Sequence, residues 1–507
     1  MDLVRIVVFF AVICCPFLGR AQFEEYSSRS EYLSIISEMS IDEIRAALLD
    51  ANAHGLHAPT YWSSAEESAY QEGRREEPEF KSQVAQKYLQ FLRDVSLGVV
   101  DPSSMGSDVS MRRKGFLSPQ QLRAVALVSG NSARVLANHL APQNSLYLGL
   151  KESLRRMKEI CAQGRWAQLP AFSGTLELGK KDPAIVAIKE RLRLLGYPSA
   201  SMGDDFDNSV LEAVNDIQWN LKIKPDGKIT SNGKTINYLN ISCQSRVQQI
   251  RADMEKMRWF PQTFEDRYIF VNLASSQFNL IDKVHGNMSF RAISGRTQRP
   301  TPTMRDKVVQ VVINPYWVVP PTIFKEDKVE EIRNLTPSQI SAYFESKNFE
   351  VWNSNLSRKL DPASIDWWSV GGDNPDILIR QKPHTGNALG VLKFMLTNSL
   401  AIYLHDTNQP ELFAEASRQL SSGCVRLEKP FDLAEYLLRG TEWTRQVIEH
   451  YAAKPGEVMQ NDTKITLEQP TSVYLIFLTS QMSSDGVIRF MEDTYQQNSR
   501  IWKSASW

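Results

Sequence analysis

The stretch Ser421-Ser422-Gly423-Cys424-Val425-Arg426 places a cysteine on a turn of small residues and follows it with an arginine. Upstream, Tyr403-Leu404-His405-Asp406-Thr407 places a histidine at the end of an apolar run. A free thiol is only slightly ionised at neutral pH, so a cysteine nucleophile needs a base or a cation nearby. We therefore predict that Cys424 is a nucleophile and that His405 is its base.

The residues around this pair indicate how such a site would work. Gly423 allows a tight turn that, together with Ser422, can expose the sulfur and point amide hydrogens at an oxyanion. Strand alternation places Arg426 on the side of Cys424, where it could bind a carboxylate, and places Tyr403 on the side of His405. No cluster of histidine and carboxylate accompanies Cys424, so we expect neither a metal nor a cofactor.

The chain has 507 residues, with 58 basic and 58 acidic side chains. This length predicts several domains, and the balanced charge gives no global field that favours nucleic acid. Arg5, an apolar run from Ile6 to Leu18 and then Gly19-Arg20-Ala21 predict a secretory signal over residues 1–21. The alternative is an uncleaved membrane anchor. We expect an exported protein.

The cysteines are consistent with export. Of the five, Cys14 and Cys15 lie in the signal, which leaves Cys161, Cys243 and Cys424. This odd number indicates one free thiol in a compartment where disulfides persist. Cys161 and Cys243 flank an inserted unit, and we hypothesise that they form a disulfide at its base.

Hydrophobic periodicity divides the remaining chain into three units. Apolar residues at spacings of three and four predict a helical domain over 22–172 that resumes at 241–262. Three short helices form a small inserted unit over 173–240. From 263 to 507 the period falls to two, which predicts a β-rich domain. A polar, helical-looking segment over 322–383 interrupts the strands and either covers the site or is ordinary decoration.

Specific strands follow from this alternation. We predict a hairpin of Gly390–Leu396 and Leu400–His405, joined by Thr397-Asn398-Ser399. We also expect Val473–Leu478 and Val487–Phe490 to complete the sheet.

The small unit resembles the peptidoglycan-binding domain of bacterial wall enzymes. The resemblance rests on these residues: Asp207, Ala213-Val214, Gln218, Leu221 and Asp226-Gly227-Lys228-Ile229. The unit departs from the pattern at Ile217, where Phe is usual, and at Thr230, where Gly is usual. The alternative is a helical spacer.

The β-rich domain closely resembles the L,D-transpeptidase catalytic domain of the YkuD type. Its motifs here are Gly390-x-x-Lys393-Phe394, His405-Asp406-Thr407 and Ser421-Ser422-Gly423-Cys424-Val425-Arg426. Asn314-Pro315-Tyr316-Trp317-x-Val319-Pro320 and Asn387-Ala388-Leu389-Gly390 narrow the resemblance to the large YcbB-like subfamily. His384 departs from that subfamily, which usually has Gly there.

The resemblance implies a multidomain α+β fold: a helical scaffold domain, a small three-helix peptidoglycan-binding domain and a β-rich catalytic domain with a capping lobe. It implies that Cys424 attacks a tetrapeptide stem of peptidoglycan, releases D-Ala and passes the acyl group to an amine of another stem, which gives a 3-3 crosslink. Tyr316, Trp317 and Asn387 then join Arg426 and Tyr403 as substrate-binding residues.

Three alternatives remain open at this point. The same acyl-enzyme could be hydrolysed, as in an L,D-carboxypeptidase, or could release a wall-anchored protein, or the chain could be an inactive peptidoglycan-binding protein. The expected partners are donor and acceptor stems, with no nucleic acid, and a membrane anchor only if the signal is uncleaved. The expected location is the periplasm or cell wall.

Overall fold

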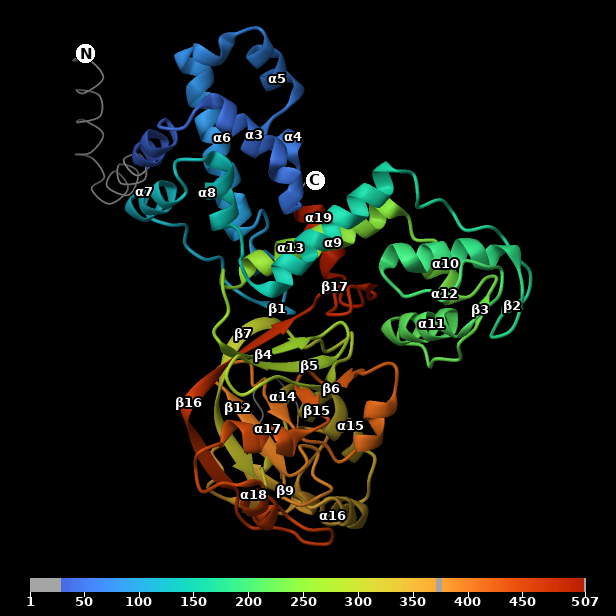
Figure 1. Ribbon diagram of the computed structural model, residues 1–507. Helices are drawn as coiled ribbons and strands as arrows, with labels where there is room; N and C mark the ends of the chain where they lie inside the picture. Colours follow the sequence, from blue (N-terminus) through green and yellow to red (C-terminus); the bar gives the residue numbers. More distant parts are fainter. Residues whose placement is uncertain (1–28, 371–375, 506–507) are drawn as a thin grey trace, which may run out of the picture.

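The computed structural model describes residues 29–370 and 376–505, so the predicted signal over 1–21 lies outside the described residues. Helices occupy the N-terminal part, a barrel-like sheet occupies the C-terminal part, and the small unit projects to one side of both (Figure 1). The multidomain α+β fold is therefore confirmed.

The helical part has the amphipathic faces that its periodicity predicts. Val84, Tyr88 and Phe91 of α6 are fully buried, and they belong to one large hydrophobic core. Caps define several helix starts; at α7, for example, Ser118 and Gln121 form a capping box. The helices are α3 (Ile41–Leu49), α4 (Ala58–Tyr61), α5 (Ser64–Gln71), α6 (Pro78–Leu97), α7 (Pro119–Val128), α8 (Ala133–Leu140), α9 (Ser145–Ala162) and α13 (Cys243–Trp259).

The small unit contains three helices and a short β-pair, namely α10 (Pro183–Leu195), α11 (Asn208–Asn220), α12 (Lys234–Leu239), β2 (Thr175–Leu176) and β3 (Ile229–Thr230). The buried side chain of Gln218 holds the turn at Asp226-Gly227 in place. Its Oε1 accepts from the Gly227 amide at 3.0 Å, and its Nε2 donates to Asp226 Oδ1 at 2.7 Å. The glutamine of the motif therefore has a structural function here.

A disulfide joins Cys161 at the end of α9 to Cys243 at the start of α13, with their Cα atoms 5.8 Å apart. The hypothesis of a clamp at the base of the inserted unit is confirmed. Cys424 is the free cysteine of the described residues. Its thiol is therefore available for chemistry.

The large sheet has ten strands and closes on itself because β7 pairs with both β12 and β16. Its order is β1-β7-β12-β13-β15-β6-β5-β4-β16, and β14 also pairs with β6. The strands are β1 (Val109–Ser110), β4 (Arg267–Asn272), β5 (Gln277–Asp282), β6 (Met288–Gly295), β7 (Thr303–Ile313), β12 (Leu392–Leu396), β13 (Leu404–His405), β14 (Gln419–Ser421), β15 (Val425–Leu427) and β16 (Thr463–Ile476). Apolar side chains from this sheet form a second core with α17 (Pro430–Leu437) and α18 (Arg445–Tyr451).

Two strand predictions were wrong. The second hairpin strand is shorter than Leu400–His405, because only β13 pairs with β12. Ile488–Phe490 (β18) does not extend the large sheet, since it pairs with Ser480–Met482 (β17) in a separate sheet of two strands. A period of two predicts a strand but does not identify its neighbour.

The segment predicted as a polar, helical-looking insertion is a lobe with its own core and a sheet of four strands. Its helices are α14 (Pro321–Ile323), α15 (Val329–Ile332) and α16 (Pro337–Ser346), which Thr336 caps. Its strands are β8 (Trp317–Val318), β9 (Phe349–Asn353), β10 (Lys359–Leu360) and β11 (Ile377–Gln381). The strands were missed because Trp and charged residues interrupt their apolar pattern.

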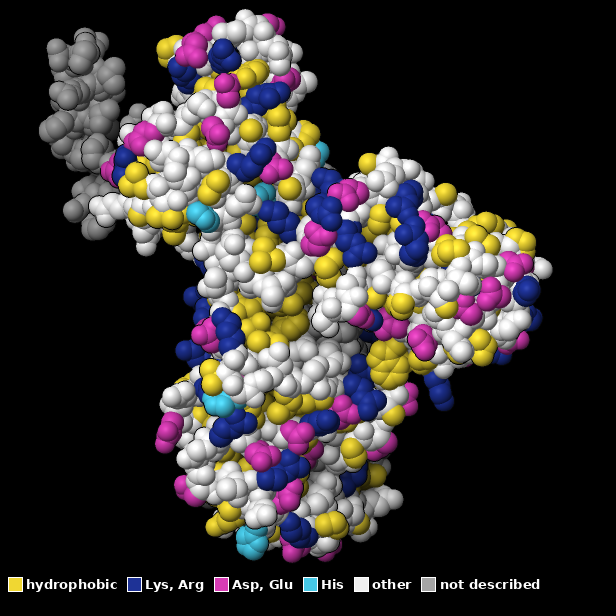
Figure 2. Space-filling view, in the orientation of Figure 1, with side chains coloured by type: hydrophobic (Ala, Val, Ile, Leu, Met, Phe, Trp, Pro, Cys, Tyr) yellow, Lys and Arg dark blue, Asp and Glu magenta, His cyan; other side chains and the backbone are white. Residues whose placement is uncertain are grey.

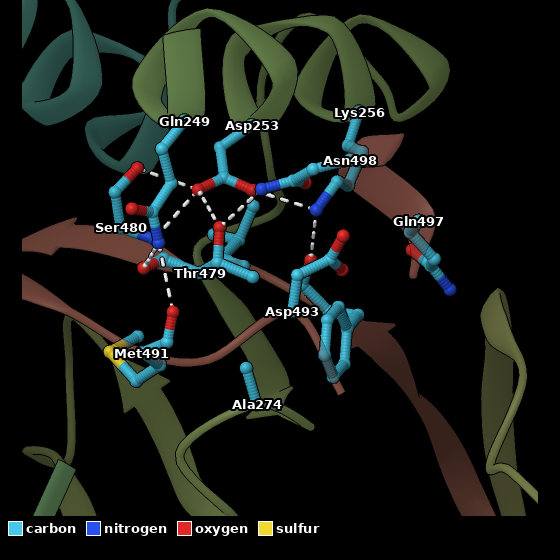
Figure 3. Close-up of polar contacts among 12 residues, drawn as sticks. Gln249, Asp253, Lys256, Ala274, Thr479, Ser480, Met491, Asp493, Gln497 and Asn498 are labelled. Atoms are coloured by element: carbon cyan, nitrogen blue, oxygen red, sulfur yellow. Dashed lines mark hydrogen bonds and ion pairs between the residues drawn. The ribbon is translucent and has the colours of Figure 1, made fainter. Parts of the chain in front are cut away.

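Helix α13 joins the helical part to the sheet domain. It runs beside α9 and contacts α19 (Gln497–Ala505). Figure 3 shows Gln249, Asp253 and Lys256 of α13 reaching the segment that contains Thr479 and Ser480. In the space-filling view, hydrophobic side chains gather between the two parts, while both signs of charge are scattered over the rest of the visible face (Figure 2).

Candidate active site

Strand register brings the predicted site residues onto one face. Lys393 pairs with His405 across the antiparallel β12 and β13, and His405 pairs with Arg426 across the parallel β13 and β15. Residues paired on neighbouring strands point to the same side of a sheet. Lys393, His405 and Arg426 therefore form one row. Tyr403 and Cys424 lie two residues before His405 and Arg426, and so they belong to the same face.

The turn before β15 holds Cys424 in place. Ser421 Oγ donates to the Cys424 carbonyl at 2.5 Å and accepts from the Gly423 amide at 3.2 Å. Gly423 has a φ of 120°, which favours glycine, and a Cβ there would lie 3.4 Å from Ile402 Cδ1. The amide hydrogen of Gly423 is thus already engaged within the turn.

The segment between β12 and β13 is a pinned loop instead of a strand. Asn398 Oδ1 accepts from the amides of Leu400 and Ile402, at 3.0 and 3.1 Å. Asp306 Oδ1 accepts from the Thr397 amide at 3.0 Å, and Ala401 has a φ of 56°. This loop ends beside the nucleophile, since Cys424 Sγ donates to the Ala401 carbonyl at 3.6 Å.

His405 is 4% exposed, and its Nδ1 atom is buried without a hydrogen-bond partner. Its ring centroid lies 5.6 Å from that of Tyr403. Burial lowers the pKa of His405 to about 3, and the charges of Arg426 and Lys393 act in the same direction. The imidazole is therefore neutral at physiological pH and is able to accept a proton.

Burial raises the pKa of the Cys424 thiol. A backbone hydrogen bond from Tyr403, the charge of Lys393, the Tyr403 hydroxyl and the charge of Arg426 oppose that rise. Burial and the neighbouring Cys424 raise the pKa of the Tyr403 hydroxyl well above its usual value, so the phenol stays protonated. Tyr403 therefore faces the sulfur as a hydrogen-bond donor.

The other predicted substrate-binding residues occupy different positions. Trp317 hydrogen-bonds Tyr403, which brings it to the site. Tyr316 donates to the Gln460 carbonyl at 2.8 Å, and Arg380 lies over its ring. Asn387 is fully buried, and its Nδ2 donates to the Pro315 and Lys382 carbonyls. Asn387 therefore supports the loop before β12, and any effect on a substrate would be indirect.

Arg299 links the lobe to the catalytic turn. It donates to Asp327 Oδ1 and Oδ2 at 2.8 Å and also pairs with Glu326. Its Nη1 lies 3.3 Å from Ser422 Oγ, two residues before the nucleophile. The Arg299 side chain is 11% exposed. The lobe is thus held against the turn that carries Cys424.

Sequence reasoning assigned no role to Lys393, Arg299 or Asp306. Lys393 stood within a recognised motif, so the spacing of that motif was an available signal. Arg299 and Asp306 act through partners distant in sequence, and no local pattern marks them. His384, the departure from the subfamily pattern, lies 2.9 Å from the Lys382 carbonyl through its Nδ1.

Comparisons with known proteins agree with this architecture. Residues 266–448 match the YkuD family, the L,D-transpeptidase catalytic domain. Residues 26–154 match a scaffold domain, and residues 181–233 match a "Putative peptidoglycan binding domain". A Haemophilus influenzae protein named "Putative L,D-transpeptidase" is 31% identical over 266 residues, which is 52% of this chain and 51% of that protein. The chain thus spans about half the length of this curated relative.

Solved structures give weaker likenesses. An L,D-transpeptidase from Xylanimonas cellulosilytica is 13% identical, with a TM-score of 0.19, over 61% of this chain and 99% of that chain. L,D-transpeptidase 1 of Mycobacterium tuberculosis is 11% identical, with a TM-score of 0.17, over 42% of this chain and 63% of that chain. These scores are too low to support an argument from overall shape.

The β-rich part matches the L,D-transpeptidase catalytic domain both in its sequence motifs and in its family model. The same chain carries a helical part that matches a scaffold domain and a small unit that matches a peptidoglycan-binding domain.

Two absences concern only the part of the chain that the structure describes. Within residues 29–370 and 376–505, no helix combines the length and apolar character needed to cross a membrane. Within the same ranges, no group of three or more His, Cys, Asp or Glu side chains could hold a metal ion.

Proposed function

We propose that this protein is a peptidoglycan L,D-transpeptidase that forms 3-3 crosslinks through a Cys424 acyl-enzyme. The observation that carries the proposal is the shared face of Cys424, Tyr403 and His405 within a domain that matches L,D-transpeptidases. Cys424 is the free thiol of the described residues, and a thiol that shares a face with a neutral imidazole is suited to covalent acyl transfer.

In the first step, the Cys424 sulfur bonds to the carbonyl carbon of the third residue of a tetrapeptide stem. His405 accepts the thiol proton and returns it to the departing nitrogen as the amide bond to the terminal D-Ala breaks. Amides near Cys424 would stabilise the oxyanion.

In the second step, an amine of another stem attacks the thioester carbonyl. The amine nitrogen forms the new amide bond, the carbon–sulfur bond breaks, and the amine loses one proton while the thiol is restored. Arg426, Tyr403 and Trp317 are proposed to orient the stems, and Tyr316 and Asn387 to support that pocket from the neighbouring loops. The lobe over 322–383 is proposed to cap the site.

The remaining parts support a wall location. The matched unit over 181–233 is proposed to bind peptidoglycan, and the disulfide between Cys161 and Cys243 is expected in an oxidising compartment. We propose that the protein is exported to the periplasm or cell wall. Sedimentation with purified sacculi tests the binding, and a variant that lacks residues 173–240 should sediment less.

The test of the activity uses labelled tetrapeptide stems and the full chain. Wild-type protein should release D-Ala and form crosslinked dimers, and C424A should lose both, by about a thousandfold or more. Dimers that persist in C424A would refute the acyl-enzyme. Trimmed stems without dimers would show water as the acceptor, which would replace the transpeptidase by a carboxypeptidase.

A further inference from the structure

Lys393 is the charged residue of the site face that the proposed mechanism leaves without a role. It lies directly opposite His405 in the β12–β13 pair, and its Nζ atom lies 3.9 Å from the centre of the Tyr403 ring. The side chain is half-buried. A half-buried ammonium that rests on an aromatic face is partly desolvated, and a nearby anion would stabilise it.

The backbone holds Lys393 in this position. The Asp406 carboxylate accepts from the Val391 amide at 2.9 Å and anchors the start of β12 to the residue after His405. A Cβ on Gly390, whose φ is 61°, would overlap that carboxylate. This anchor fixes the start of β12, and Lys393, three residues after Gly390, therefore lies opposite His405 in the sheet.

Other buried lysines of the described residues have hydrogen-bond partners, which need not be carboxylates: Lys114 donates to the Phe260 carbonyl and Lys222 to Gln419 Oε1. Lys189 and Lys256 have fully buried side chains, and each lies 2.7 Å from a carboxylate, of Asp207 and Asp253 respectively. Lys393 has no carboxylate partner among the residues that the structure describes. Its electrostatic neighbours are Cys424, Asp462 and Lys464, and Asp462 lies 3.4 Å from Lys464. Of the two groups whose negative charge would raise the pKa of Lys393, Cys424 has a larger effect than Asp462.

We propose that Lys393 is a positioning residue whose ammonium is the resident counter-charge of the Cys424 thiolate. This proposal rests on the proposed function, because it assumes that Cys424 is the nucleophile. Tyr403 lies between the two groups, and its ring and hydroxyl contact the ammonium and the sulfur respectively. Arg426 is the second cation of this face: its Nη1 is directed to Gln409 Oε1 at 3.3 Å, and its Nε is buried without a hydrogen-bond partner.

The electrostatics of the site agree with this geometry. Burial raises the pKa of the Cys424 thiol, and Lys393 provides the largest opposing effect of any charged side chain. Reciprocally, burial lowers the pKa of Lys393, and the charge of Cys424 opposes that shift. The groups that act on the sulfur are Lys393, Tyr403 and Arg426, and His405 lies between Lys393 and Arg426 in the strand register. Only Lys393 and Arg426 are cations, because His405 is neutral.

The test is the pH dependence of iodoacetamide alkylation in the full chain with its disulfide formed, followed by mass spectrometry of the peptide that contains Cys424. Cys424 is the free thiol of the described residues, and reading its own peptide separates its ionisation from that of Cys14 and Cys15. K393M should raise the apparent pKa of Cys424 by about one unit and slow alkylation near neutral pH by about tenfold. K393R should keep most of the wild-type rate, and K464M, from the same neighbourhood, should leave the profile unchanged.

Each outcome decides the proposal. An unchanged profile in both K393M and K393Q would overturn it, and so would a higher KM for stems with an unchanged profile, which would identify Lys393 as a contact for a substrate carboxylate. A K393M that fails to fold is replaced by K393Q. The assay needs no peptidoglycan. A failure of the proposed function would instead appear as transfer activity that survives in C424A.

Discussion

Two regions of this molecule bury charge in opposite ways. In α13, Asp253 and Lys256 lie 2.7 Å apart, and Glu255 and Arg258 lie 3.0 Å apart, with all four side chains fully buried. On the site face, Lys393 and the imidazole of His405 lack such partners. A buried charge that has its partner stabilises one arrangement of the chain. A polar group that lacks some of its hydrogen-bond or charge partners can still bind a reactant.

The α13 pairs also show the cost of satisfying a buried charge. Asp253 accepts from Lys256, from the Thr479 hydroxyl at 3.0 Å, and from the Ser480 amide and hydroxyl at 2.6 Å (Figure 3). All these donors must come together for one carboxylate. The polar groups of the site face cannot all have partners within the protein, because they would then be unable to contact a substrate.

The largest expected effect concerns the site face, where buried groups lack partners. H405N should lower kcat/KM for acyl transfer by about a hundredfold or more, because it removes the proton acceptor. In wild-type protein, kcat/KM should rise with pH as the thiol, whose pKa burial raises, loses its proton. Since the pKa of His405 is about 3, no imidazole titration should appear between about pH 5 and 8.

A pH-rate profile with stem substrates measures both features. A loss of kcat/KM as the pH falls through about 6.5 that disappears in H405N would show that the imidazole titrates near its ordinary pKa. The burial of His405 would then not set its charge, and the contrast with α13 would be lost.

The next largest effect concerns the buried ion pairs of α13. D253N should lower the free energy of unfolding by about 3 kcal/mol, because it leaves the buried Lys256 ammonium without its counter-charge. The control is D266N, whose pair with Lys283 has side chains 75% and 72% exposed, and it should cost less than about 1 kcal/mol. Urea unfolding followed by circular dichroism measures both. Equal losses in the two variants would contradict the structural role of the α13 pairs.

The smallest expected effect tests Arg299, which has a carboxylate partner, as the α13 cations do, and also contacts the turn of the site. Arg299 is paired with Asp327 yet lies beside Ser422, so R299Q should loosen the lobe without altering the nucleophile. We expect KM for stems to rise about fivefold, equivalent to roughly 1 kcal/mol, with kcat nearly unchanged. R305Q, which breaks an exposed pair with Glu265, is the matched control. A loss confined to kcat would show that Arg299 acts on the turn instead of the lobe.

The sequence predicted most of the architecture because its signals are local. Helical spacing identified the buried face of α6, and alternation identified β4 to β7. The first strand of the predicted hairpin is present as β12, but the second, Leu400–His405, was wrong before its last two residues, because Asp306 and Asn398 pin the loop through contacts that no alternation encodes. The lobe strands were missed because polar residues on the paired strands interrupt the alternation of apolar and polar residues.

Local chemistry also determined which residues were candidates. A cysteine on a glycine turn and a histidine at the end of a strand are visible in the sequence, whereas Lys393 was only one letter of a motif. Only the folded chain decided how their charges act. Strand register set Lys393, His405 and Arg426 in one row, and burial then raised the pKa of the thiol and lowered that of the imidazole. These shifts depend on desolvation and on charges from other strands, and neither exists until the strands pair.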